Sequence, residues 1–145
     1  MKKILVINGP NLNFLGIREP DIYGKNTYAD LCDKITAKAE KIGVTVELFQ
    51  SNHEGALVDY IQEAYFLHVD GIVFNPAAYT HTSIAILDAL KSISIPTVEV
   101  HISDPTTREA FRHISYAGLA CVKTIKGQGL DGYRQAIAYL KENYG

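Results

Sequence analysis

Short runs of apolar residues alternate with segments of helical periodicity along the whole chain. Five apolar runs have the length of strands: 4–7, 44–49, 71–74, 96–100 and 119–125. Four segments carry apolar positions at helical spacing: 28–42, 54–68, 80–92 and 130–144. This alternation is typical of a parallel sheet whose strands are joined by helices. We therefore predict an α/β fold, a flavodoxin-like three-layer sandwich with a five-stranded parallel sheet, formed by a single domain over residues 1–145.

The same periodicity predicts which side chains pack inward. Tyr65 and Ile84 fall on the apolar stripes of the second and third helical segments. Cys32 lies in a helical pattern and Cys121 in the last apolar run. We expect both cysteines to be small buried side chains, because they have no partner at the spacing of a disulfide scaffold or a metal site.

The longest segment without a regular pattern is 9–25, directly after the first predicted strand. Long loops in compact domains are usually functional or disordered. This one holds Arg18 and Tyr23. A phenol is a poor base at neutral pH, but a guanidinium held close to it favours the phenolate. We expect the segment to be a lid that closes both residues over a substrate; the alternative is a surface tyrosine beside a solvated arginine.

Polar residues come directly after four of the five predicted strands. The carboxyl ends of parallel strands meet at one edge of the sheet, where ligands of open α/β folds bind. Asparagine and serine are also common turn and capping residues, which is the alternative for each position taken alone. The candidates at this edge are Asn8, Asn11, Asn75, His81, His101 and Ser103, with His53 as a weaker candidate for a supporting role.

Glu99 and His101 lie two residues apart on one predicted strand, so their side chains share a face. A carboxylate in that position orients and polarises an imidazole for acid or base catalysis; the alternative is a chance alternation near a strand end. Arg108 and Arg112 are spaced to share a helical face. We expect Arg108 to be solvated and Arg112 to be the better candidate for an anionic or polyhydroxylated substrate.

Composition and charge exclude several classes of protein. The chain has 145 residues and a formal net charge of −2, and 47% of its residues are hydrophobic. The charge argues against nucleic-acid binding, and the apolar content argues against disorder. The apolar run 4–7 ends too soon for a signal peptide, and no run approaches a membrane span. We expect a cytoplasmic protein without nucleic-acid or membrane partners.

The missing motifs limit the chemistry. The chain has neither a Walker-type phosphate loop nor a dinucleotide-binding GxGxxG after the first strand, and no GxSxG nucleophile elbow. It also lacks the spacing of a zinc or magnesium site. A flavin-binding module and a receiver domain are disfavoured, because their phosphate loop and acidic cluster are absent. Tyrosine, histidine, arginine and asparagine without a cofactor suit proton abstraction beside a carbonyl, followed by acid-assisted loss of a hydroxyl.

A set of motifs covering nearly the whole chain resembles type II 3-dehydroquinate dehydratases. The motifs are NGPNLN at 8–13, GIREP at 16–20, YG at 23–24, QSNHEG at 50–55, NPAAYTHTS at 75–83, EVHIS at 99–103 and REAFRH at 108–113. The resemblance implies dehydration of 3-dehydroquinate to 3-dehydroshikimate in the shikimate pathway, without metal or Schiff base. It also implies a homo-oligomer, a dodecamer built as a tetramer of trimers.

The resemblance also implies a role for individual residues in the reaction. Tyr23 removes a C2 proton, and Arg18 holds Tyr23 as phenolate. Asn11 positions a water that stabilises the enolate. His101 protonates the departing C1 hydroxyl, with Glu99 as its partner.

Further residues are implied in substrate binding. Asn75 and the backbone of Ile102 and Ser103 hold the substrate carboxylate. His81 and Arg112 bind ring hydroxyls. Asp88 reaches into the site from a neighbouring subunit.

The chain departs from the common pattern of this family in three places. Asp-Pro-Thr at 104–106 stands where Asn, a branched apolar residue and His are common. Leu87 stands where Arg is frequent, and Ala56 replaces a common Glu. None of these positions is among the residues implied in proton transfer.

Overall fold

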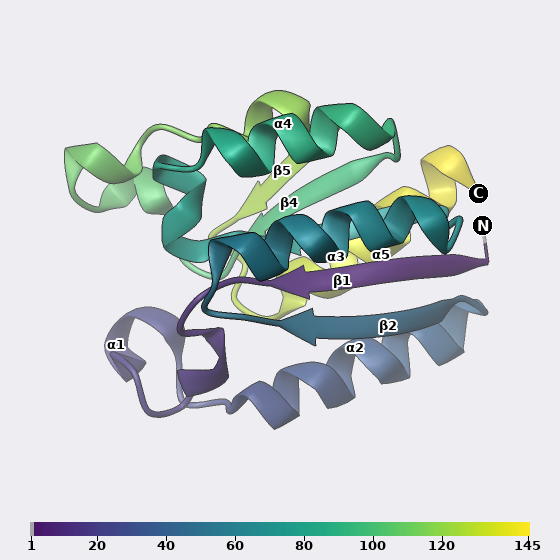
Figure 1. Ribbon diagram of the computed structural model, residues 1–145. Helices are drawn as coiled ribbons and strands as arrows, with labels where there is room; N and C mark the ends of the chain where they lie inside the picture. The colour runs from purple at the N-terminus through teal and green to yellow at the C-terminus, as the bar shows by residue number, and fades with distance from the viewer. Residues whose placement is uncertain (1) are drawn as a thin grey trace.

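The computed structural model describes residues 2–145, which build one sheet of five strands (Figure 1). The strands lie in the order β2-β1-β3-β4-β5 and every neighbouring pair is parallel, which confirms the predicted flavodoxin-like α/β fold. The strands are β1 (Lys3–Asn8), β2 (Thr45–Gln50), β3 (Gly71–Asn75), β4 (Thr97–His101) and β5 (Lys123–Lys126).

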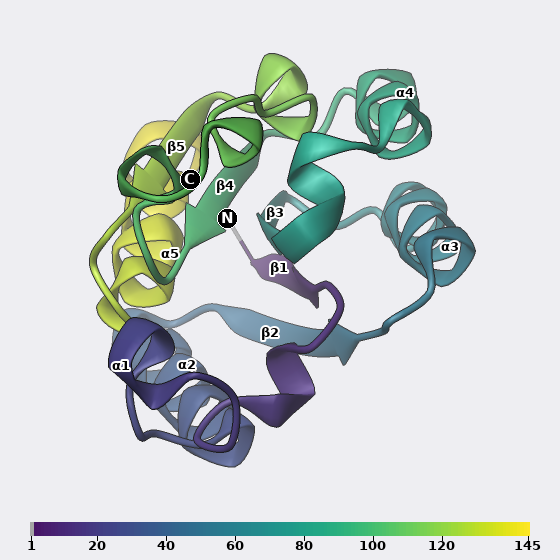
Figure 2. The same ribbon diagram turned by 90° about the vertical axis from the view of Figure 1, so that its left-hand side faces the viewer.

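Two long helices cover each face of the sheet, α2 and α5 on one face and α3 and α4 on the other (Figure 2). The local sequence sets where they begin. The Thr27 side chain accepts a hydrogen bond from the N–H of Asp30, whose carboxylate accepts one from the N–H of Thr27, and this reciprocal cap starts α2. The helices are α1 (Pro20–Tyr23), α2 (Tyr28–Ile42), α3 (Glu54–Phe66), α4 (Ile84–Ile93) and α5 (Asp131–Tyr144).

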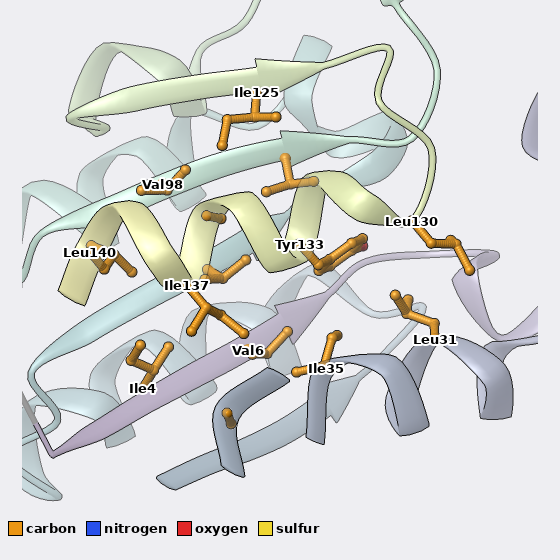
Figure 3. Close-up of a cluster of buried hydrophobic side chains, with 14 of the residues drawn as sticks. Ile4, Val6, Leu31, Ile35, Val98, Ile125, Leu130, Tyr133, Ile137 and Leu140 are labelled. Atoms are coloured by element: carbon orange, nitrogen blue, oxygen red, sulfur yellow. The ribbon is translucent and has the colours of Figure 1, made fainter. Parts of the chain in front are cut away.

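Alternate side chains along the strands pack into two separate hydrophobic cores, one on each face of the sheet. In β1, Ile4 and Val6 pack with α2 and α5, whereas Leu5 and Ile7 pack with α3 and α4. All four side chains are fully buried, as expected for a strand covered on both faces. Figure 3 shows the first core, in which Tyr133 of α5 lies among aliphatic side chains from the sheet and α2.

The segment before the last strand differs from the prediction. Only the last part of the strand expected over 119–125 forms, as β5. A 3-10 helix, η5 (Ala117–Ala120), precedes it and packs against α4. Ala117 is buried while Leu119 is exposed. A short apolar run does not by its periodicity distinguish a strand from another buried segment. Cys121 therefore lies just before β5, and it is only partly buried, as is Cys32.

The predicted inward stripes of two helices are also partly wrong. The helix expected over 80–92 is divided into a 3-10 helix, η2 (Ala77–His81), and α4, which begins after Ser83 because that side chain accepts a hydrogen bond from the N–H of Ile86. Ile84 is two residues from the buried Ile86 and therefore lies on the other side of α4, 56% exposed. Tyr65 of α3 is likewise 55% exposed.

Two segments lie over the carboxyl edge of the sheet, which faces the viewer in Figure 2. Segment 9–25 contains α1 and a 3-10 helix, η1 (Leu12–Phe14), so it is less irregular than predicted. Segment 102–122 contains η3 (Pro105–Thr107), η4 (Ala110–Arg112) and η5. Arg108 and Arg112 therefore come from two short turns rather than one helical face.

Within residues 2–145, no helix combines the length and the apolar content needed to cross a membrane.

Candidate active site

A cavity lies at the carboxyl edge of the sheet, between segment 9–25 and the residues that come after β3 and β4. Most of the predicted site residues line it: Asn11, Arg18, Tyr23, Asn75, His81, His101, Ile102, Ser103 and Arg112. Arg108 joins them, although it was expected to be solvated. Glu99 lies behind His101, whereas Asp88 does not line the cavity.

Tyr23, the last residue of α1, contacts two guanidinium groups. Nη1 of Arg108 donates a hydrogen bond of 2.7 Å to the Tyr23 hydroxyl oxygen. The Arg18 guanidinium carbon lies 4.4 Å from the centroid of the Tyr23 ring. Both cations favour negative charge on the phenol. Arg18 therefore packs on the Tyr23 ring, unlike the solvated arginine of the alternative interpretation, and the cation at the phenol oxygen is Arg108.

Glu99 and His101 form a buried pair on β4, as their spacing predicted. Nε2 of His101 lies 2.9 Å from Oε2 of Glu99. Burial by itself would raise the pKa of Glu99, but hydrogen bonds from His101, Ser115 and Thr124 outweigh it and hold that pKa below its ordinary value. The resulting carboxylate is placed to accept a hydrogen bond from Nε2–H of His101 and to orient the ring.

The floor of the cavity rests on a buried hydrogen-bonded cluster of Asn8, Asn75 and Tyr133. The Tyr133 hydroxyl accepts from Nδ2 of Asn75 at 2.9 Å and donates to Oδ1 of Asn8 at 2.6 Å. Oδ1 of Asn75 accepts from the N–H of Ala77 at 3.0 Å. Burial raises the pKa of Tyr133 far above its ordinary value, so the hydroxyl remains a donor. These bonds fix the orientation of Asn75.

Replacing Tyr133 by phenylalanine is expected to lower the free energy of unfolding by about 1–3 kcal/mol, because it leaves buried polar atoms of Asn8 and Asn75 unpaired. Urea unfolding followed by circular dichroism, at matched protein concentrations, measures the loss. Tyr139→Phe on the same helix is the control, since the Tyr139 hydroxyl bonds to no other group in residues 2–145. Equal midpoints for the two variants would show that the cluster contributes no stability.

Asn11 is positioned by residues at the end of β2 and just after it. Oδ1 of Asn52 accepts a hydrogen bond of 3.0 Å from the backbone N–H of Asn11. Nε2 of Gln50 donates to Oδ1 of Asn52 and to the carbonyl of Gly9, at 3.2 and 3.1 Å. Asn11 has a φ of 68°, a conformation that asparagine tolerates better than most residues. The supporting role considered for His53 thus belongs to its neighbour Asn52.

The backbone after β4 offers two free donors. The carbonyls of Ile102 and Ser103 accept from the N–H groups of Gly129 and Gly127, both at 3.1 Å. The N–H groups of Ile102 and Ser103 themselves donate to no protein acceptor within residues 2–145. Successive free N–H groups form an anion-binding concavity. This part of the cavity therefore suits a carboxylate.

His81 and Arg112 supply polar groups to the opposite wall. Nδ1 of His81 lies 2.7 Å from the carbonyl of Ile114, so Nδ1–H donates and Nε2 is left as an acceptor. Burial lowers the pKa of His81, and its hydrogen bond to Ile114 only partly offsets this. Nε of Arg112 donates to Glu109 at 2.7 Å, which orients the guanidinium. An acceptor and a cation at this wall suit ligand hydroxyls.

Three side chains that support the site could not be predicted from the sequence. The sequence places Tyr133 on an apolar helical stripe but does not indicate that its hydroxyl supports the site. Thr124 lies directly beside Glu99 in the register of β4 and β5, but that register is not readable from one chain. Ser115 lies in a segment without regular periodicity.

The arrangement brings a phenol and an imidazole to one cavity. Tyr23, supported by two cations, is suited to remove a proton, and His101, supported by Glu99, is suited to supply one. No lysine is among the cavity-lining residues. Within residues 2–145, no group of three or more histidine, cysteine, aspartate or glutamate side chains is arranged to hold a metal ion.

Known proteins similar to this chain are 3-dehydroquinate dehydratases. The family model for class II dehydroquinases matches residues 2–141. A 3-dehydroquinate dehydratase of Clostridium acetobutylicum is 59% identical over 139 residues, covering 96% of each chain, and one of Caldicellulosiruptor bescii is 56% identical over 142 residues, covering 98% of each. The crystal structure of a type II dehydroquinase from Butyrivibrio crossotus superposes with a TM-score of 0.95 at 57% identity, covering 97% of each chain. The chain therefore belongs to the class II dehydroquinase family, and it is a hydro-lyase of the 3-dehydroquinate dehydratase type.

Proposed function

We propose that this protein converts 3-dehydroquinate to 3-dehydroshikimate and water through an enolate, with Tyr23 as the base and His101 as the acid. The observation that carries the proposal is the placement of the Tyr23 oxygen and the His101 ring on one cavity, each with its own charged partner. This reaction is a step of the shikimate pathway, as the resemblance of the motifs implies.

The first step is removal of a proton from C2, beside the ketone, by the phenolate of Tyr23. The electron pair of the C–H bond moves toward the ketone oxygen and forms the enolate. Arg108 at the phenol oxygen and Arg18 over the ring favour the phenolate that this step needs. Asn11, held by Asn52, is placed to position a water against the enolate oxygen.

The second step is loss of the C1 hydroxyl. The enolate electrons return to form the C1–C2 double bond, and the C1–O bond breaks as His101 gives the leaving oxygen a proton, so that water departs. The Glu99 carboxylate supports the imidazolium form that makes this transfer possible. Tyr23 ends protonated and His101 neutral, so one net proton transfer between them restores the starting enzyme.

The remaining contacts fix the substrate. The free N–H groups of Ile102 and Ser103, together with Asn75, suit the substrate carboxylate. His81 and Arg112 suit its ring hydroxyls. Binding at both ends holds C2 next to the base and C1 next to the acid. Fixing the reacting atoms in this geometry lowers the entropic cost of the reaction and so raises its rate.

We further propose that the chain assembles as a dodecamer, a tetramer of trimers, in which Asp88 completes the site of a neighbouring subunit. Asp88 is exposed on α4 and lies outside its own cavity. The same helix exposes Ile84, and segment 102–122 exposes Phe111 and Ile114, each by more than half. Apolar side chains exposed on this scale are typical of surfaces that another chain covers.

A direct assay tests the proposal. The purified protein is mixed with 3-dehydroquinate, and the ultraviolet absorbance of the conjugated enone is followed with and without borohydride pretreatment. We expect turnover in both samples, because the reaction uses no lysine imine. Absence of turnover in a folded protein would overturn the proposal, and loss of turnover after borohydride would overturn the enolate route. Light scattering on the same preparation should give about twelve times the 16.0 kDa chain mass.

A further inference from the structure

The Glu99 carboxylate behind His101 is surrounded by hydrogen-bond donors. Oε2 accepts from Nε2 of His101 at 2.9 Å and from Oγ of Ser115 at 2.6 Å. Oε1 accepts from Oγ1 of Thr124 at 2.8 Å. Glu99 is 1% exposed, so these three donors replace the water that an ionised carboxylate would otherwise bind.

The sheet places Thr124 beside Glu99. The two residues are directly paired between the parallel strands β4 and β5, so their side chains point to the same face. Thr124 does not line the cavity that holds Tyr23, whereas His101 does. Its hydroxyl donates to the carboxylate from an adjoining cavity, which Glu99 and Ser115 also line.

Ser115 is held in place by the turn that comes after it. The N–H of Gly118 donates to Oγ of Ser115 at 2.9 Å, which leaves the hydroxyl proton to point at Glu99. A Cβ on Gly118 would lie 2.8 Å from Oε1 of Glu99 and 2.9 Å from Oγ of Ser115. The turn thus fits closely around the carboxylate, and only glycine leaves room for both groups.

We propose that Ser115 and Thr124 are positioning residues for His101: they hold Glu99 as an oriented carboxylate, and thereby fix the tautomer and orientation of the imidazole that protonates the leaving group. This inference rests on the proposed dehydration. Neither residue lines the cavity that holds Tyr23, and both act through Glu99.

The direction of the effect follows from electrostatics. Removing a donor leaves the Glu99 carboxylate less well solvated, so it accepts a larger share of the proton between Nε2 of His101 and Oε2. A proton that resides on Glu99 no longer holds the imidazole in the Nε2–H form. We therefore expect kcat to fall.

Other charged groups around the pair remain unchanged by these substitutions. Cys121 lies near Glu99, and the other charged or titratable groups lie around His101. The electrostatic effect of these groups on the pair is the same in all the variants. The groups around His101 are Tyr23, His81, Asp104, Arg108, Arg112 and Lys126.

The experiment compares Thr124→Val, which keeps the shape and removes the hydroxyl, with Thr124→Ser, which keeps the hydroxyl. For Thr124→Val we expect kcat to fall about tenfold with KM unchanged, close to the loss of one hydrogen bond to a charged group. Thr124→Ser should retain wild-type behaviour. Ser115→Ala should act in the same direction as Thr124→Val.

A second readout does not depend on turnover. Nitrogen-15 NMR of histidine-labelled protein reports the tautomer of His101, and we expect the Nε2–H form in wild type and a mixed population in Thr124→Val. A wild-type rate profile and an unchanged spectrum in that variant would overturn the inference. So would an equal loss of kcat in Thr124→Ser, which indicates packing alone. Failure of the proposed function is distinct, because it removes turnover from the wild type.

Discussion

Replacing Tyr23 by phenylalanine is expected to lower kcat by about a thousandfold or more, in line with the ~10²–10⁴ that a positioned general base contributes. The change removes only the hydroxyl oxygen. The ring that packs under Arg18 is kept, and so are the groups placed for the substrate carboxylate and hydroxyls. KM and the affinity for the product, measured by calorimetry, should therefore change little.

The control for this variant is Tyr65→Phe, which alters an exposed tyrosine on α3 far from the cavity. Its kcat should equal that of wild type. Near-normal turnover in Tyr23→Phe would contradict the assignment of Tyr23 as the base. A loss confined to KM would reassign Tyr23 to substrate binding.

Replacing Arg108 by methionine is expected to lower kcat/KM by about a hundredfold. Nη1 of Arg108 donates directly to the Tyr23 oxygen, where the proposed base carries its negative charge. Methionine cannot donate this charge-assisted hydrogen bond, which is worth about 1.5–3 kcal/mol.

Arg18→Met is the matched comparison, because both changes exchange a guanidinium for an unbranched apolar chain. Arg18 contacts the ring face, and such a contact is worth about 0.5–2 kcal/mol, whereas a hydrogen bond to a charged group is worth about 1.5–3 kcal/mol. The fall in kcat/KM should therefore be larger in Arg108→Met than in Arg18→Met. A larger fall in Arg18→Met would reverse the two roles. Initial rates of both variants over a range of 3-dehydroquinate concentrations distinguish these outcomes.

The sheet and most of the site could be predicted because both depend on local signals. Runs of apolar residues of strand length mark β1 to β4, and parallel strands end at one edge, so the polar residues after each strand are brought together there. Glu99 and His101 are paired by the twofold repeat of a strand. The long segment 9–25 pointed to Arg18 and Tyr23, and the motif resemblance then assigned roles to Tyr23 and Asn11.

The remaining features depend on contacts between distant parts of the chain. Arg108 reaches Tyr23 across 85 positions, and Tyr133 reaches Asn8 across 125. Segment 102–122 consists of short 3-10 turns whose positions are set by the elements they pack against. The apolar residues at its end have the spacing of a strand, although they form a 3-10 turn. No periodicity within a single chain encodes these pairings.

The cluster under the cavity makes the site depend on the last helix of the chain. Every cavity-lining residue lies at or before position 112, yet the hydroxyl that joins Asn8 to Asn75 comes from α5. The floor is therefore complete only once α5 has packed onto the sheet. A chain that lacks α5 would carry the residues lining the cavity but not the bonds that orient Asn75.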